Sequence, residues 1–228
     1  MMNKLTGTGV AIVTPFHKDG SVDFNALGKL VEHLITGGVE YLVVLGTTGE
    51  SVTLNKNEKV AVVNHVVETA DKRVPIVMGL GGSNTQEILH SMADFDFDGI
   101  EAILSVSPYY SKPIQEGIFQ HYKMIAGASP VPVILYNVPG RTGSNVTAET
   151  TLRLAEVPNI IGIKEASGNL EQMMHIIKNR PKGFLVISGD DSLTMPLIAS
   201  GGDGVISVVA NAYPKLYSDM VRSSLKGN

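Results

Sequence analysis

Short apolar runs alternate with longer amphipathic segments along the whole chain. Each run is rich in Val, Ile and Leu and is short enough to form a single strand. Because the runs are apolar on both sides of the strand, they predict a sheet that is covered on both faces. The predicted strands cover residues 9–15, 41–47, 74–80, 99–108, 131–137, 160–164, 184–189 and 204–210.

The segments between these runs have the periodicity of helices. Two of them begin with a helix-start signal, since Asn55 is followed by Glu58 and Asn84 by Glu87. At this spacing an N-cap side chain and a carboxylate satisfy free backbone amides of the first turn. The predicted helices cover residues 24–35, 57–69, 85–95, 114–126, 147–156, 170–178, 193–200 and 214–225.

Regular alternation of strand and helix predicts an α/β protein with a parallel sheet. Eight such units indicate closure into a (β/α)8 TIM barrel, with residues 1–228 forming a single barrel domain. An open, doubly wound sheet is the alternative, but no GxGxxG sequence lies between the first strand and the first helix, which disfavours a dinucleotide-binding fold. We interpret the glycine-rich residues 79–84 as a tight turn rather than a phosphate-binding loop.

Composition narrows the kind of partner. The chain has 228 residues, 43% of them hydrophobic, a formal net charge of -4 and no cysteine. The absence of a basic stripe favours a small-molecule or protein partner over nucleic acid or an anionic membrane. No apolar run reaches the roughly 18 residues of a membrane span and the first residues do not resemble a signal peptide, so we expect a cytoplasmic protein. Zinc is not expected, because none of the histidines pairs with another at metal-ligand spacing; they are His17, His33, His65, His90, His121 and His175.

Lys164 is the most informative residue at a strand end. In a TIM barrel the active site lies at the carboxyl ends of the strands, and Lys164 ends the sixth apolar run. Burial lowers the pKa of an amine, and the neutral amine is a nucleophile towards carbonyl groups. Position alone leaves two interpretations open, a Schiff-base lysine and a lysine in a structural ion pair.

Other polar residues gather at the same predicted rim. Tyr136 ends the strand next to that of Lys164, where its phenol could transfer protons or simply be a core tyrosine. The threonines Thr47 and Thr48 lie between glycines, in a run that fits a ligand-binding loop or an ordinary turn. Arg141 is expected in a loop between Gly140 and Gly143, where it could bind a carboxylate or remain a solvated surface residue.

A run of three carboxylates does not belong to this rim. Residues 94–98, with the sequence DFDFD, lie between a predicted helix and the fourth strand. We interpret them as a polar turn with two packed phenylalanines at the opposite rim of the barrel.

Six motifs follow one another in the order and at the spacing of a known family. They are GTTGES at residues 46–51, SPYY at 107–110, YNVPGRTG at 136–143, GIKEASGN at 162–169, SGDD at 188–191 and GVISV at 204–208. Together they resemble the dihydrodipicolinate synthases, pyruvate-dependent aldolases that share the N-acetylneuraminate lyase barrel. The resemblance implies a Schiff-base-forming lyase that condenses pyruvate with L-aspartate 4-semialdehyde to 4-hydroxy-tetrahydrodipicolinate, in diaminopimelate and lysine biosynthesis.

The resemblance also implies four catalytic residues. Lys164 would form the imine with the keto carbon of pyruvate, and Tyr136 would act as general acid and base. Thr47 would pass protons between Tyr136 and Tyr110, where the family pattern brings the second tyrosine from a neighbouring subunit. The site would therefore depend on a dimer.

Substrate binding is implied for four further residues. Thr48 and backbone amides of its loop would hold the pyruvate carboxylate, and Arg141 would bind the carboxylate of the semialdehyde. Backbone groups at Gly189 and Ile206 would line the site. No metal or other cofactor is expected, because a protonated imine is itself the electron sink.

Two other functions remain possible at this point. A related aldolase such as N-acetylneuraminate lyase is disfavoured by Arg141, because the pattern of that relative lacks an arginine there. A non-catalytic binding barrel is a more remote alternative, disfavoured by the presence of both Lys164 and Tyr136.

The sequence also departs from the family pattern. Lys56 and Lys59 stand where lysine-regulated members have histidines, and Ser83 replaces an asparagine, so we expect weak or absent inhibition by lysine. The pattern continues past the last predicted helix into a further helical region, whereas this sequence ends at Asn228. The resemblance implies a homodimer or homotetramer.

Overall fold

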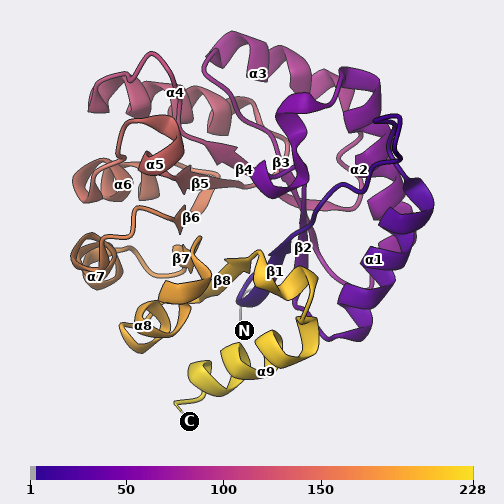
Figure 1. Ribbon diagram of the computed structural model, residues 1–228. Coiled ribbons are helices and arrows are strands. Elements are labelled where there is room, and N and C mark those ends of the chain that lie inside the picture. The colour runs from indigo at the N-terminus through magenta and orange to yellow at the C-terminus, as the bar shows by residue number, and fades with distance from the viewer. Residues whose placement is uncertain (1–3, 228) are drawn as a thin grey trace.

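The computed structural model describes residues 4–227, in which eight strands close into a barrel. The strands follow one another around the barrel in chain order, and every neighbouring pair is parallel (Figure 1). This confirms the TIM barrel and excludes the open sheet; residues 1–3 and 228 of the predicted domain lie outside the described residues. The strands are β1 (Gly7–Ala11), β2 (Tyr41–Val44), β3 (Ile76–Gly79), β4 (Ile100–Val106), β5 (Val133–Asn137), β6 (Ile160–Glu165), β7 (Leu185–Ser188) and β8 (Gly204–Ser207).

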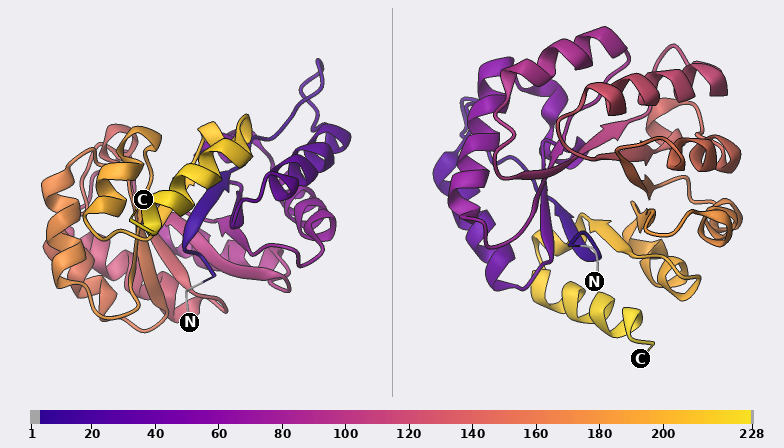
Figure 2. Two further views of the ribbon diagram at one scale, coloured as in Figure 1. Left: turned by 90° about the horizontal axis from the view of Figure 1, so that it is seen from below. Right: turned by 180° about the vertical axis from the view of Figure 1, so that it is seen from behind.

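Helices surround this ring of strands, as both face-on views show (Figure 1 and Figure 2, right). Helix α9 packs against β1 and α1, so the last described helix lies beside the first strand. The helices are α1 (Phe24–Thr36), α2 (Lys56–Ala70), α3 (Thr85–Ser91), α4 (Gln115–Ala128), α5 (Pro139–Thr142), α6 (Ala148–Ala155), α7 (Leu170–Asn179), α8 (Thr194–Ala199) and α9 (Pro214–Leu225).

The predicted helix-start signals lie at the starts of α2 and α3. Asn55 accepts a hydrogen bond from Glu58 N while the Glu58 carboxylate accepts one from Asn55 N, which is a complete capping box. The side chain of Asn84 accepts from the amides of Gln86 and Glu87. These bonds fix where each helix begins after its strand-end loop.

Two apolar layers hold the barrel together. Alternate residues along a strand point to opposite faces, so Leu42 and Val44 of β2 pack against the helices while Tyr41 and Val43 fill the barrel interior. Interior residues of the other strands include Leu104, Ile134, Tyr136, Ile187 and Ile206. The strands are therefore buried on both faces, as the apolar runs predicted.

Several local features differ from the sequence-based expectation. The first strand, expected over residues 9–15, is Gly7–Ala11. The eighth strand ends at Ser207 rather than at residue 210, because residues Val209–Asn211 turn into a 3₁₀ helix, η5. The segment Pro139–Thr142, expected as a loop, is the short helix α5. Asp94 was expected at the opposite rim with the rest of the run 94–98. It instead forms an ion pair with Lys56 Nζ (2.6 Å), which lies in the first turn of α2.

Candidate active site at the carboxyl end of the barrel

Lys164 and Tyr136 lie side by side at the ends of β6 and β5. The two residues are register partners in the parallel ladder, so their side chains point to the same face of the sheet. The Lys164 Nζ atom lies 4.3 Å from the centre of the Tyr136 ring, and the Lys164 residue is only 5% exposed. An amine and a phenol thus meet at the top of the barrel interior.

Burial changes the acidity of both groups. It lowers the pKa of Lys164 to about 8, and the positive charge of Arg141 acts in the same direction, while Asp191 opposes it. A structural ion pair would instead raise the pKa of this lysine, so the environment of Lys164 resembles that of a nucleophile. Burial raises the pKa of the Tyr136 phenol, although a hydrogen bond with the Thr47 side chain and the charge of Arg141 each act to lower that pKa.

The loop after β2 brings Thr47 to this pair. Leu45 has a positive φ of 57°, which is strained for a bulky side chain, and Thr47–Gly49 then form the one-turn 3₁₀ helix η1. Gly79 makes this path possible, because a Cβ there would lie 2.2 Å from Leu45 O. The Thr14 hydroxyl donates to Gly49 O (2.7 Å), and Thr48 is half-buried in the same turn.

Arg141 reaches the site from the helix that the sequence analysis missed. Helix α5 has Pro139 at its first position and ends at Gly143 with a φ of 73°, so both ends have favourable local chemistry. Arg141 is exposed, yet its charge influences both Lys164 and Tyr136. The guanidinium is therefore at the entrance of the site and free to bind an anionic group.

Gly189 and Ile206 approach the site from β7 and β8. A Cβ added at Gly189 would lie 3.0 Å from Lys164 Cε and 3.2 Å from its Cγ, so the missing side chain makes room for the lysine. Ile206 is buried in the interior layer that also contains Tyr136. Asp191 belongs to the motif SGDD and had no role of its own in the sequence analysis. Its Oδ2 accepts hydrogen bonds from the amides of Val208 and Val209 (3.0 and 3.1 Å), which turns the chain after β8.

Tyr110 stands apart from the buried pair. It is 93% exposed and has a positive φ of 69°, so its ring projects from the β4–α4 loop into solvent. The neighbouring loop supports this position, since the Ser83 hydroxyl donates to Tyr109 O (2.8 Å). In the described part of the chain, Tyr110 is therefore not buried beside Lys164 as Tyr136 is.

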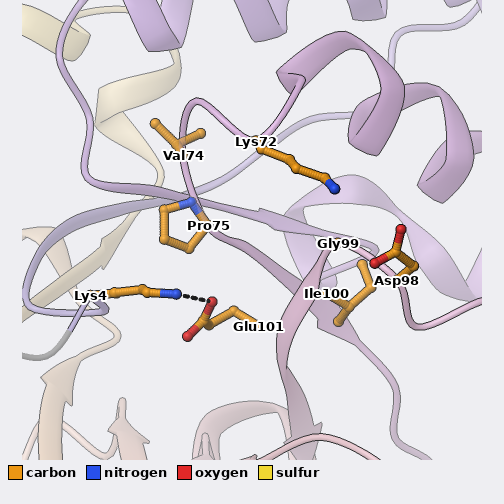
Figure 3. Close-up of a pocket in the computed structure, with 8 residues that line it drawn as sticks. All are labelled: Lys4, Lys72, Val74, Pro75, Asp98, Gly99, Ile100 and Glu101. Atoms are coloured by element: carbon orange, nitrogen blue, oxygen red, sulfur yellow. Dashed lines mark hydrogen bonds and ion pairs between the residues drawn. The ribbon is translucent and has the colours of Figure 1, made fainter.

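A cleft of about 1040 Å³ opens beside these residues and reaches Tyr136; the buried Lys164 is not itself one of its lining residues but lies against the Tyr136 ring. The cleft is lined by residues of the loops that follow β2, β3, β4 and β5, among them Thr47, Tyr110, Tyr136 and Arg141. A second hollow, of about 530 Å³, lies at the opposite end of the barrel, where Lys4 and Glu101 form an exposed ion pair (Figure 3). In barrels of this kind the carboxyl end is where chemistry is found, so the larger cleft is the candidate active site.

The described part of the chain has neither a metal-binding cluster nor a membrane-spanning helix. In residues 4–227 no group of three His, Cys, Asp or Glu side chains is arranged to hold a metal ion. Over the same residues no helix combines the length and the apolar character needed to cross a membrane.

Comparison with known proteins gives the family. The sequence profile of the dihydrodipicolinate synthetase family matches residues 4–228. The 4-hydroxy-tetrahydrodipicolinate synthase of Flavobacterium psychrophilum is 57% identical over 226 residues, which cover 99% of this chain and 77% of that protein. The crystal structure of chloride-inhibited dihydrodipicolinate synthase from Acinetobacter baumannii complexed with pyruvate has 44% identity and a TM-score of 0.95, over 98% of this chain and 77% of that one. The structure of dihydrodipicolinate synthase from Aquifex aeolicus has 39% identity and a TM-score of 0.94, over 98% and 76%. The chain belongs to the dihydrodipicolinate synthetase family.

Proposed function

We propose that this protein is a Schiff-base-forming lyase that condenses pyruvate with L-aspartate 4-semialdehyde to 4-hydroxy-tetrahydrodipicolinate, in lysine and diaminopimelate biosynthesis. The observation that carries the proposal is the buried amine of Lys164, with its pKa lowered to about 8, against the ring of Tyr136. The names of the relatives, and the pyruvate in one of their structures, support the same reaction.

The chemistry begins with imine formation. The neutral Lys164 amine attacks the keto carbon of pyruvate, and the oxygen leaves as water after proton transfers that we assign to Tyr136. The protonated imine then withdraws electrons from the methyl carbon, which loses a proton to give an enamine. The enamine carbon attacks the aldehyde carbon of the semialdehyde, whose oxygen takes a proton and becomes a hydroxyl group. Water then releases an open-chain amino keto acid from Lys164, and its amino group condenses with its keto group, with loss of water, to close the ring of 4-hydroxy-tetrahydrodipicolinate.

The remaining residues have binding or relay roles in this proposal. Thr47, which hydrogen-bonds to Tyr136, relays protons towards Tyr110. Thr48 and the amides of its turn hold the pyruvate carboxylate, while Arg141 at the cleft entrance binds the carboxylate of the semialdehyde. The Gly189 and Ile206 backbones form the wall opposite. No metal or other cofactor takes part.

We further propose that the active protein is a homodimer or homotetramer in which Tyr110 enters the site of a neighbouring subunit. The exposure of Tyr110, Val52 and Ile114 on the loops around the cleft supports an interface there. We expect the chain to act as one barrel domain in the cytoplasm. Sedimentation of the purified protein tests the assembly.

The test of the function compares two substrates. With pyruvate and the semialdehyde, the purified protein should form product, and Lys164→Ala should abolish turnover. A related reaction, cleavage of N-acetylneuraminate, is the second candidate. Arg141 disfavours it, because a guanidinium at the entrance suits the carboxylate of a short acid better than a polyol chain. Faster turnover of N-acetylneuraminate than of the semialdehyde would overturn the proposal.

A further inference from the structure

Directly behind Lys164 lies a second buried ionisable group, the carboxylate of Glu165. The residue is 0% exposed and is next to Lys164 on β6, so its side chain points to the opposite face of the strand. The carboxylate accepts hydrogen bonds from Asn137 Nδ2 (3.0 and 3.2 Å), Gln172 Nε2 (2.9 Å) and Ser167 N (2.7 Å). Its partners are amide groups, and none of these bonds comes from a cation.

The first partner, Asn137, belongs to the strand of Tyr136. Asn137 follows Tyr136 on β5 and is the register partner of Glu165, just as Tyr136 is the register partner of Lys164. The side chains of Tyr136 and Lys164 point into the barrel from β5 and β6. The hydrogen bond between Asn137 and Glu165 therefore joins the same two strand ends on their outer face. Any shift of one strand end along the other changes both sides together.

The same network reaches the loop that follows α5, the helix of Arg141. Asn137 Nδ2 donates to Asn145 Oδ1 (2.8 Å), and Asn137 Oδ1 accepts from Val146 N (3.0 Å). Asn145 Nδ2 donates to Gln172 Oε1 (2.8 Å), and Gln172 returns to Glu165, which closes the network. One carboxylate thus connects the ends of β5 and β6, which carry Tyr136 and Lys164, with the loop that follows α5, the helix of Arg141.

An ionised carboxylate can only accept hydrogen bonds, and a buried one without donors is costly. Replacing one oxygen by an amide nitrogen sets an N–H group against the Asn137 or Gln172 donors, and the local structure must then move. Since the network touches only the residues behind the site, the movement is expected there. If Glu165 contributed only to overall stability, its replacement would not displace the residues behind the site in particular.

We propose that Glu165 is a positioning residue, whose carboxylate, held by Asn137 and Gln172, keeps Lys164 against Tyr136 and fixes the loop that follows α5, the helix of Arg141. The inference rests on the proposed function in that Lys164 is taken as the imine-forming amine. It assigns to Glu165 no contact with substrate.

The test uses Glu165→Gln, the milder Gln172→Met and a matched control, Glu40→Gln. Glu40 is a carboxylate that is less buried than Glu165, with a backbone donor, Thr8 N (2.7 Å), and an ion pair to Arg222, and it lies at the other end of the barrel. The first readout is the rate at which pyruvate and cyanoborohydride modify Lys164. We expect a loss of about 100-fold in Glu165→Gln, about tenfold in Gln172→Met and less than about twofold in the control, because small displacements of a reacting group cost this much.

A second readout does not depend on pyruvate. Trace acetic anhydride labels neutral amines, so the labelling of Lys164 against pH, read by mass spectrometry, gives the pH at which half of this amine is neutral. We expect that pH to rise in Gln172→Met, since a displaced amine is better hydrated while Glu165, Asp191 and Arg141 keep their charges. In Glu165→Gln the loss of the carboxylate charge acts against this rise, so the rise should be smaller there.

The outcomes separate the two proposals. If the wild-type protein forms no pyruvyl adduct, the proposed function fails, and the labelling readout still decides the role of Glu165. If the folded Glu165→Gln and Gln172→Met variants match the wild type in labelling, or if Glu40→Gln shifts it equally, Glu165 is not a positioning residue. Gln172 is partly exposed on α7, so its variant keeps the test valid if Glu165→Gln does not fold.

Discussion

The pH dependence of imine formation follows directly from the burial of Lys164. The pKa of this amine is lowered from 10.5 to about 8. At pH 7 about 9% of an amine with a pKa near 8 is neutral, against about 0.03% at a pKa of 10.5, a gain of about 300-fold in the reactive form. Between pH 6 and pH 9 the neutral fraction of Lys164 should rise about 90-fold, with half of the maximum near pH 8.

The assay measures the initial rate of pyruvyl adduct formation on Lys164 with cyanoborohydride, from pH 6 to pH 10. Two variants check the sign of the electrostatic contributions. Arg141→Met removes a charge that lowers the pKa of Lys164, so the midpoint should move to higher pH. Asp191→Asn removes a charge that raises it, so the midpoint should move to lower pH.

Two results of the pH profile would contradict the lowered pKa of Lys164. A rate that climbs tenfold per pH unit up to pH 10 would mean that Lys164 titrates as a solvated amine. Midpoints that move in the same direction in Arg141→Met and Asp191→Asn would show that the two charges do not act on this amine as described.

Four further predictions concern other parts of the molecule. Gly189→Ala places a Cβ 2.7 Å from Ala166 Cβ and 3.0 Å from Lys164 Cε, so we expect adduct formation to fall by about 30-fold or more and the free energy of unfolding to fall by about 1–3 kcal/mol; an unchanged rate would contradict the contact with Lys164. Tyr136→Phe should lower kcat by about 100-fold with a smaller effect on pyruvate binding, and wild-type turnover would remove the phenol from proton transfer. Burial lowers the pKa of His121 to about 4, so the folded state holds the neutral imidazole and loses about 3 kcal/mol of stability as pH falls from 6.5 to 4. Urea unfolding at several pH values measures this loss, and a His121→Gln variant with the same pH dependence would refute the assignment. Inhibition by L-lysine should be weak, because Lys59 places a cation on the wall of the cleft whereas the charge of Lys56 is paired with Asp94, and half-maximal inhibition below about 1 mM would show otherwise.

Most of the fold was predictable because each strand is apolar on both faces and each helix is amphipathic. What failed were the short segments whose conformation depends on distant residues. The eighth strand was predicted to continue to Ala210, but the Asp191 carboxylate from the end of β7 takes the amides of Val208 and Val209 and turns the chain. Helix α5 is only one turn long, and its glycine and proline resemble a loop in sequence.

The candidate site was predictable in position more than in chemistry. Strand ends could be read from the sequence, and Lys164 and Tyr136 do meet as register partners. Whether Lys164 is a nucleophile or half of an ion pair depends on burial and on the charges of Arg141 and Asp191, which come from other loops. The network around Glu165 was not predictable, since its amide partners come together only in the folded barrel.

The central claim is that Lys164 forms an imine with pyruvate. The most direct measurement is incubation of the folded protein with pyruvate and borohydride, followed by mass spectrometry of its peptides. The account predicts one pyruvyl adduct, on the peptide that contains Lys164, and none in Lys164→Ala. No adduct on the folded protein, or an adduct confined to another lysine, would contradict it.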